Sequence, residues 1–120
     1  MNTTAMNQHN IKLLEGIGSS CEEIQQSLKV HLETTTSSQY KMDIEKDMVT
    51  LENLKRITIA IRTDIETGKL GASTELLLRI AANDFNNKLV RIPEKKSVRD
   101  RASKSLKEVH RNILQTTTAA

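Results

Sequence analysis

The sequence of 120 residues contains no tryptophan, one tyrosine, one phenylalanine, one proline, one cysteine and four glycines. Because aromatic side chains are almost absent, any core must be built from Leu, Ile, Val, Ala and Met. The shortage of proline, together with 28% charged residues, favours helices over a β-sandwich or a barrel. The length suits one domain with a modest core. We therefore predict a single all-α domain.

Other absences bear on the compartment. The lone Cys21 has no second cysteine to pair with, which is typical of a protein from a reducing compartment. No apolar run approaches the roughly 18 residues of a membrane-spanning helix, and the first ten residues lack the features of a secretory leader. We expect a protein of the nucleus or the cytoplasm that is neither secreted nor embedded in a membrane.

Apolar residues recur at steps of three and four along much of the chain, which is the pattern of amphipathic helices. Between Ile57 and Ile61 the pattern alternates instead, and with no second alternating segment to pair with, it indicates a buried turn between helices. We predict a polar loop at 34–38 and a long loop at 83–93. The five predicted helices span residues 9–33, 42–56, 59–67, 72–83 and 96–114. Residues 1–9 and 116–120 are expected to be flexible tails around a helical interaction domain at 10–115.

The same periodicity predicts the core and one special turn. Met42 and Met48 are most simply core residues, and Gly71 is expected to hold a backbone conformation closed to other residues. The side chains that we predict to be buried are Leu28, Leu51, Leu54, Ile59, Ile65, Leu77, Ala102, Leu106 and Val109.

The order of apolar residues resembles the N-terminal domain family of transcription elongation factor TFIIS. That family has a Leu-x-x-Leu-x-x-Leu-x-Ile-Thr run followed by a hydrophobic pair, and this run is similar to the series Leu51, Leu54, Ile57, Ile59, Ile61 and Ile65. The family then has a Thr and a glycine turn, which are similar to Thr67 and Leu70-Gly71. Beyond the turn, Thr74 and Leu77 take the places of its Val and Leu. Within that family the chain resembles most the LEDGF/JASPer-type integrase-binding domain over roughly residues 22–115, through Met42-Asp43-Ile44 and Leu51-Glu52-Asn53-Leu54. Two positions depart from it: Val109 stands where TFIIS has Trp, and Gln39-Tyr40-Lys41 replaces the Ile-Asp pair of LEDGF.

This resemblance implies a compact five-helix bundle that binds short disordered motifs and has no enzymatic activity and no cofactor. The partners it implies are motifs of transcription or chromatin proteins, a chromatin kinase among the candidates, bound by a monomer at a notch between two loops. The location it implies is the nucleus. On this chain the notch residues would be Tyr40, Lys41, Arg79, Phe85, Lys88 and Val90, with Arg79 and Lys88 receiving acidic residues of the partner. Alternatively, Tyr40 and Phe85 only pack their loops onto the bundle.

Two other functions stay open. The first is a structural helical subunit that buries its apolar stripes against partner helices. The second is nucleic-acid binding, because the segment from Arg91 to Arg111 carries eight Lys or Arg against three acids. We expect this to be a minor role, since no aromatic residue is interleaved for base stacking. The sequence contains no motif for catalysis or metal binding. His9, His31 and His110 are far apart, and none has a second metal-binding residue at the usual spacing.

Overall fold

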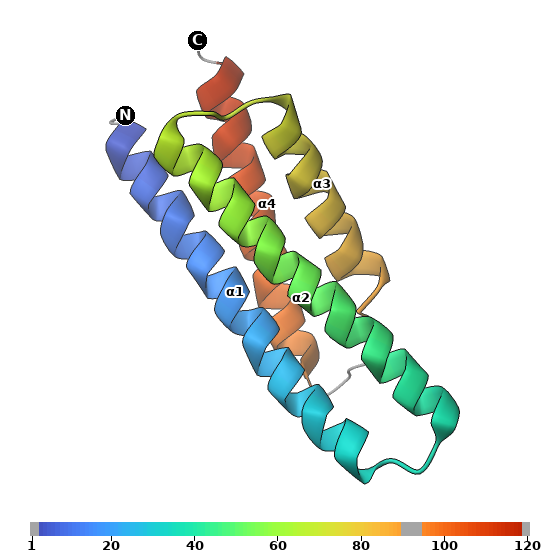
Figure 1. Ribbon diagram of the computed structural model, residues 1–120. Coiled ribbons are helices and arrows are strands. Elements are labelled where there is room, and N and C mark those ends of the chain that lie inside the picture. The colour runs from blue at the N-terminus through green and yellow to red at the C-terminus, as the bar shows by residue number, and fades with distance from the viewer. Residues whose placement is uncertain (1–2, 90–94, 119–120) are drawn as a thin grey trace.

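The computed structural model describes residues 3–89 and 95–118, and every regular element in these two ranges is an α-helix. The helices are α1 (Thr3–Thr34), α2 (Ser38–Thr67), α3 (Ala72–Asn87) and α4 (Lys96–Thr118). Successive helices run in opposite directions, so that the start of α1 lies beside the end of α4 at one end of the molecule (Figure 1). The prediction of an all-α fold is confirmed.

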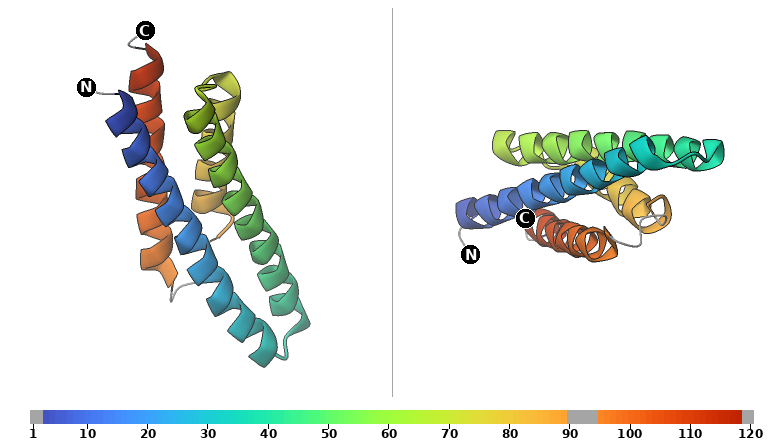
Figure 2. Two further views of the ribbon diagram at one scale, coloured as in Figure 1. Left: turned by 60° about the vertical axis from the view of Figure 1, so that its left-hand side comes forward. Right: turned by 90° about the horizontal axis from the view of Figure 1, so that it is seen from below.

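The helices pack in a ring, in which α1 contacts α2 and α4, and α3 contacts the same two helices. The molecule is elongated, with principal extents of 55 × 21 × 20 Å. Since α3 and α4 are shorter, the α1–α2 hairpin projects beyond them at one end (Figure 2). A band of Leu, Ile, Val and Ala side chains from all four helices forms the core, and Phe85 of α3 is its largest member.

The connection between α1 and α2 takes only three residues, as predicted for the polar loop near 34–38. The Ser37 Oγ accepts a hydrogen bond from the backbone N–H of Tyr40 at 3.2 Å, which caps the start of α2. On the other side of the loop, the Thr35 N–H donates to the His31 carbonyl at 2.9 Å. A loop this short forces the two long helices to lie antiparallel.

The five-helix count is wrong, because α2 continues through the segment that alternates in sequence. Within this helix, Ile57 and Ile61 lie one turn apart on the same side, whereas Ile59 points to the opposite side, since each step of two residues turns the side chain by about 200°. Ile61 is buried, Ile57 is half-buried and Ile59 is 63% exposed, so the predicted burial of Ile59 is also wrong. Placing a β-branched residue in a helix costs a few tenths of a kcal/mol. The free energy gained by burying Leu54 and Ile61 outweighs this cost.

Several boundaries also differ from the prediction. Residues 3–9, expected to belong to a flexible tail, form the first turns of α1, and α2 begins at Ser38 instead of residue 42. At the other ends, α3 runs on through Asn87 instead of ending at residue 83, and α4 continues to Thr118, into the predicted tail at 116–120. The remaining predicted core residues are buried, except for Leu77, which is half-buried while the neighbouring Leu78 is fully buried. Met42 is 52% exposed, so its interpretation as a core residue is wrong.

In the turn between α2 and α3, the glycine with the left-handed conformation is Gly68, whereas the sequence analysis predicted Gly71. Gly68 has φ +69°, and the N–H groups of Gly68 and Lys69 donate to the carbonyls of Ile65 and Asp64, as in a Schellman motif. Gly71 has φ −173°, an extended conformation that other residues also adopt, so the prediction for Gly71 is wrong. Thr74 joins the two helices, since its Oγ1 donates to the Asp64 carboxylate at 2.7 Å and accepts from the Gly71 N–H.

Candidate peptide-binding groove between α2 and α3

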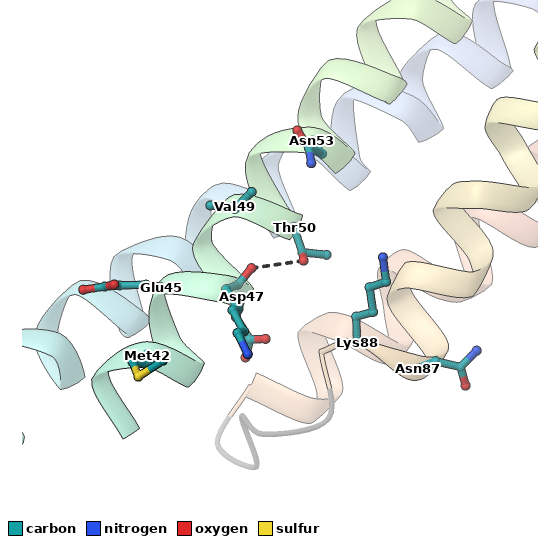
Figure 3. Close-up of a pocket in the computed structure, with 9 residues that line it drawn as sticks. Met42, Glu45, Asp47, Val49, Thr50, Asn53, Asn87 and Lys88 are labelled. Atoms are coloured by element: carbon teal, nitrogen blue, oxygen red, sulfur yellow. Dashed lines mark hydrogen bonds between the residues drawn. The ribbon is translucent and has the colours of Figure 1, made fainter. Parts of the chain in front are cut away.

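A hollow lies between the first half of α2 and the end of α3. Its volume is about 680 Å³. Figure 3 shows the α2 side chains along one wall, with Asn87 and Lys88 at the end of α3 opposite them. The lining residues are Met42, Glu45, Lys46, Asp47, Val49, Thr50, Asn53, Asn87 and Lys88. This set is called the α2–α3 groove below.

The apolar part of the groove comes from two residues that lie seven positions apart on α2. Met42 is 52% exposed and Val49 is 61% exposed. Seven residues are close to two full helical turns, so both side chains lie on the same face of the helix. Because this face points away from the core residues Leu51 and Leu54, both groups are available to a partner.

Polar groups at the groove are fixed by contacts of their own. The Lys88 ammonium lies 3.2 Å from the carboxylate of Asp84, a buried residue of α3. The Thr50 hydroxyl donates to the Lys46 carbonyl one turn earlier, at 3.1 Å. Asp47 is buried at the base of the groove. The groove therefore combines an apolar stripe with cations, acids and amides at its sides, a composition that suits a peptide with mixed side chains.

Of the five predicted peptide-binding residues that the structure describes, only Lys88 lines this groove. Phe85 is 1% exposed inside α3, so its expected place in an exposed loop is wrong, and the alternative of a core-packing role describes it better. Tyr40 lies in the first turn of α2 and stacks on His31 with ring centroids 6.2 Å apart. Val90 lies outside the described residues.

The other two predicted residues are surface cations away from the groove lining. Lys41 is exposed in the first turn of α2. Arg79 is exposed on α3 and forms an ion pair with Glu75 one turn earlier, at 2.7 Å. Sequence reasoning missed Met42 and Val49. A helical projection that starts from Leu51 could have found them, since Val49 falls about 200° around the helix from that core residue.

Cys21 and His9 do not line the groove. Cys21 is fully buried in α1, and burial raises the pKa of its thiol to about 12, which keeps it protonated and unreactive at neutral pH. His9 contacts Glu108 at 3.0 Å, at the far end of the bundle from the α1–α2 loop. Within the described ranges, no cluster of three or more His, Cys, Asp or Glu is arranged to hold a metal ion.

The lateral contact between α1 and α2 is a polar network around Lys55. Its ammonium donates to Glu22 at 2.7 Å and to Gln25 at 3.1 Å, and it lies 3.5 Å from Glu52. The hydrogen bond from Lys55 lowers the pKa of Glu22. The hydrogen bond from Gln25, with the charge of Lys55 second, lowers the pKa of Glu52. These contacts fix the register of the hairpin whose α2 half forms the groove wall.

None of the four described helices has a stretch of apolar residues that could span a membrane. The chain matches no protein-family model, no curated protein and no solved structure. The resemblance to the TFIIS N-terminal domain therefore stays a prediction from the sequence.

Proposed function

We propose that this protein is a non-enzymatic interaction module whose α2–α3 groove binds a short disordered segment of a partner protein. The observation that carries this proposal is the pair Met42 and Val49, two apolar side chains exposed on one face of α2 beside a groove of about 680 Å³. Apolar anchors that enter a surface hollow dominate the affinity of small interfaces. The rigid helices on either side keep the hollow formed before the partner arrives, which lowers the entropic cost of binding.

The charged residues around the groove favour a partner with both signs of charge. Lys46 and Lys88 are exposed and suit acidic residues of the peptide, while Glu45 suits a basic one. The origin of the peptide in transcription or chromatin proteins, and a nuclear location, are proposed on the sequence resemblance alone. We propose that the module is a monomer.

The alternative of a structural helical subunit is favoured by Leu76 and Ile80, two exposed apolar residues one turn apart on α3. A subunit of this kind would associate through α3 and show a mass above that of one chain. Light scattering after gel filtration separates the two proposals. A dimer or larger assembly that falls back to a monomer when Leu76 and Ile80 are substituted would support the structural subunit.

Selection of peptides followed by chemical-shift mapping tests the proposed function. A displayed library of disordered protein segments is selected against the full chain, and the best peptide is titrated into ¹⁵N-labelled protein. We expect the amide shifts to concentrate between Met42 and Asn53 and at Lys88. Shifts centred on another surface, or a library that yields no binder, would overturn the proposal.

A further inference from the structure

Positive charge is concentrated on α4. This helix contains six Lys or Arg against two acids, whereas α1, α2 and α3 together contain eight Lys or Arg against twelve acids. The net charge is therefore +4 on α4 and −4 on the other three helices combined. A charge distribution of this kind raises the local concentration of polyanions near one side of a protein.

Four of the α4 cations form a row on the exposed side of the helix. Arg101, Lys104, Lys107 and Arg111 are all exposed. Their intervals of three, three and four residues keep them on one broad face, over a rise of about 15 Å. These four residues are called the α4 basic row below.

The acids of α4 do not neutralise this row. Asp100 pairs with Lys96 at 3.0 Å, and Glu108 pairs with His9 of α1 at 3.0 Å. Within residues 3–89 and 95–118, none of the four cations of the row forms an ion pair with a carboxylate. Their charge is therefore available to an external partner.

The chemistry of the row favours phosphate over other anionic partners. Between Arg101 and Arg111 every apolar side chain of α4 is buried, so the row has no anchor for a peptide and no apolar face to enter a membrane. It also has no aromatic residue on which single-stranded bases could stack. The backbone of a nucleic-acid duplex requires only cations, and over 15 Å it presents about nine phosphates, since one charge falls every ~1.7 Å of its axis.

We propose that the α4 basic row binds the phosphate backbone of double-stranded nucleic acid without reading its sequence. In the ring of helices, α4 lies diagonally opposite α2, whose outward face forms one wall of the α2–α3 groove. The duplex and a peptide in the groove would therefore bind on different sides of the bundle. The inference does not depend on the proposed function, because the two surfaces share no residue.

The test measures binding of the full chain to a 20-base-pair DNA duplex by fluorescence anisotropy between 50 and 200 mM salt. If all four cations contact phosphates, log Kd should change with log salt by a slope of about 3.6, at about 0.9 per contact. The variant with Arg101→Gln, Lys104→Gln, Lys107→Gln and Arg111→Gln should bind at least ten times more weakly at 50 mM salt and lose most of that slope. Circular dichroism checks that each variant remains helical.

A control variant removes the same charge elsewhere, with Lys12→Gln, Lys41→Gln, Arg56→Gln and Lys69→Gln, all at exposed positions on other elements. We expect its duplex affinity to stay within about threefold of the wild type, because the row is intact. Equal losses in both variants would show a general charge effect and overturn the proposal. Tighter binding to phosphatidylserine vesicles than to the duplex, with the same dependence on the row, would also overturn it in favour of a membrane surface.

Discussion

At the scale of single residues, the two glycines around the α2–α3 turn have different roles. Gly68 ends α2 with φ +69°, a conformation that costs other residues roughly 1–2 kcal/mol because Cβ approaches the following carbonyl. Gly71 precedes α3 with an extended backbone. A Cβ would meet nothing within 4 Å at either position, so backbone conformation alone separates them.

The same substitution should therefore have opposite consequences at the two sites. Gly68→Ser should lower the free energy of unfolding by about 1 kcal/mol or more, because serine must adopt the left-handed conformation. Gly71→Ser should leave it unchanged or raise it slightly, since serine is a favourable residue before a helix. Urea unfolding followed by circular dichroism measures both. Similar losses at the two positions would contradict this account of the turn.

Residue burial could be predicted from the sequence where one helical stripe dominates. Leu51, Leu54 and Leu106 follow such stripes, and all three are buried as predicted. The prediction failed at Ile59 and Met42, where apolar residues occur off the stripe. Where a helix carries apolar residues on two faces, the sequence alone does not show which face is buried. The answer depends on where the neighbouring helices lie.

At the scale of elements, α2 shows how packing overrides local preference. Its Ile57–Ile61 stretch has the alternation of a strand, yet the stretch is helical because its flanking turns bury Leu54 and Ile65 against the other helices. The end of α3 behaves in the same way. The polar residues around Phe85 predicted a loop, but burial of Phe85 in the core keeps this segment helical.

These element errors also explain why so little of the candidate site could be predicted. The polar residues around Phe85 predict a loop and hence a place in a peptide notch, whereas the continuous α3 places Phe85 in the core. Lys88 is predicted to lie at the rim of that notch, and in the structure it lines the α2–α3 groove, because it directly follows the end of α3. The groove itself depends on how α2 and α3 cross, which no local sequence pattern specifies.

The core of the bundle can be tested with two truncations and an exposed control. Leu54→Ala and Leu106→Ala should each lower the free energy of unfolding by about 2–5 kcal/mol, because each leaves a cavity among fully buried side chains. Ile59→Ala should change it by less than about 0.5 kcal/mol, since Ile59 is exposed. Chemical denaturation provides all three values. A cost at Ile59 equal to that at Leu54 would contradict the continuous α2.

The Lys55 network predicts a pH dependence of the α1–α2 pairing. The pKa of Glu22 lies below its ordinary value of 4.5 in the folded protein, so its contribution to stability is present above that value and is lost as pH falls through the lowered pKa. The pKa of Glu52 is also lowered, so its contribution to stability is likewise lost as the pH falls. Lys55→Gln should therefore be less stable than the wild type near pH 6.5, and this difference should shrink near pH 3.

Urea midpoints at the two pH values measure this effect. Lys41→Gln is the control, because Lys41 is an exposed cation of the same helix without an ion pair to a described residue. Its difference from the wild type should stay small and independent of pH. A stability difference for Lys55→Gln that is the same at both pH values would show that the network contributes through packing of the lysine chain rather than through charge.

At the scale of the whole molecule, the ring of helices separates two surfaces of different chemistry. The α2–α3 groove offers an apolar pair beside mixed charges, and the α4 basic row offers cations without apolar neighbours. The N-terminus of α1 and the C-terminus of α4 lie together at one end, while the α1–α2 hairpin projects at the other (Figure 1). A rigid bundle with this arrangement can hold a protein segment on one side and a polyanion on another.

The central claim is that Val49 anchors a peptide in the α2–α3 groove, and one comparison of affinities tests it most directly. Val49 and Val30 are exposed to 61% and 60%, and both lie in long helices, but only Val49 lines the groove. Isothermal titration calorimetry of the selected peptide compares Val49→Ala with Val30→Ala. We predict about 15-fold weaker binding for Val49→Ala, since two buried methylene equivalents contribute about 1.6 kcal/mol, and an unchanged Kd for Val30→Ala. An unchanged Kd for Val49→Ala, or the same loss for both variants, would contradict the account.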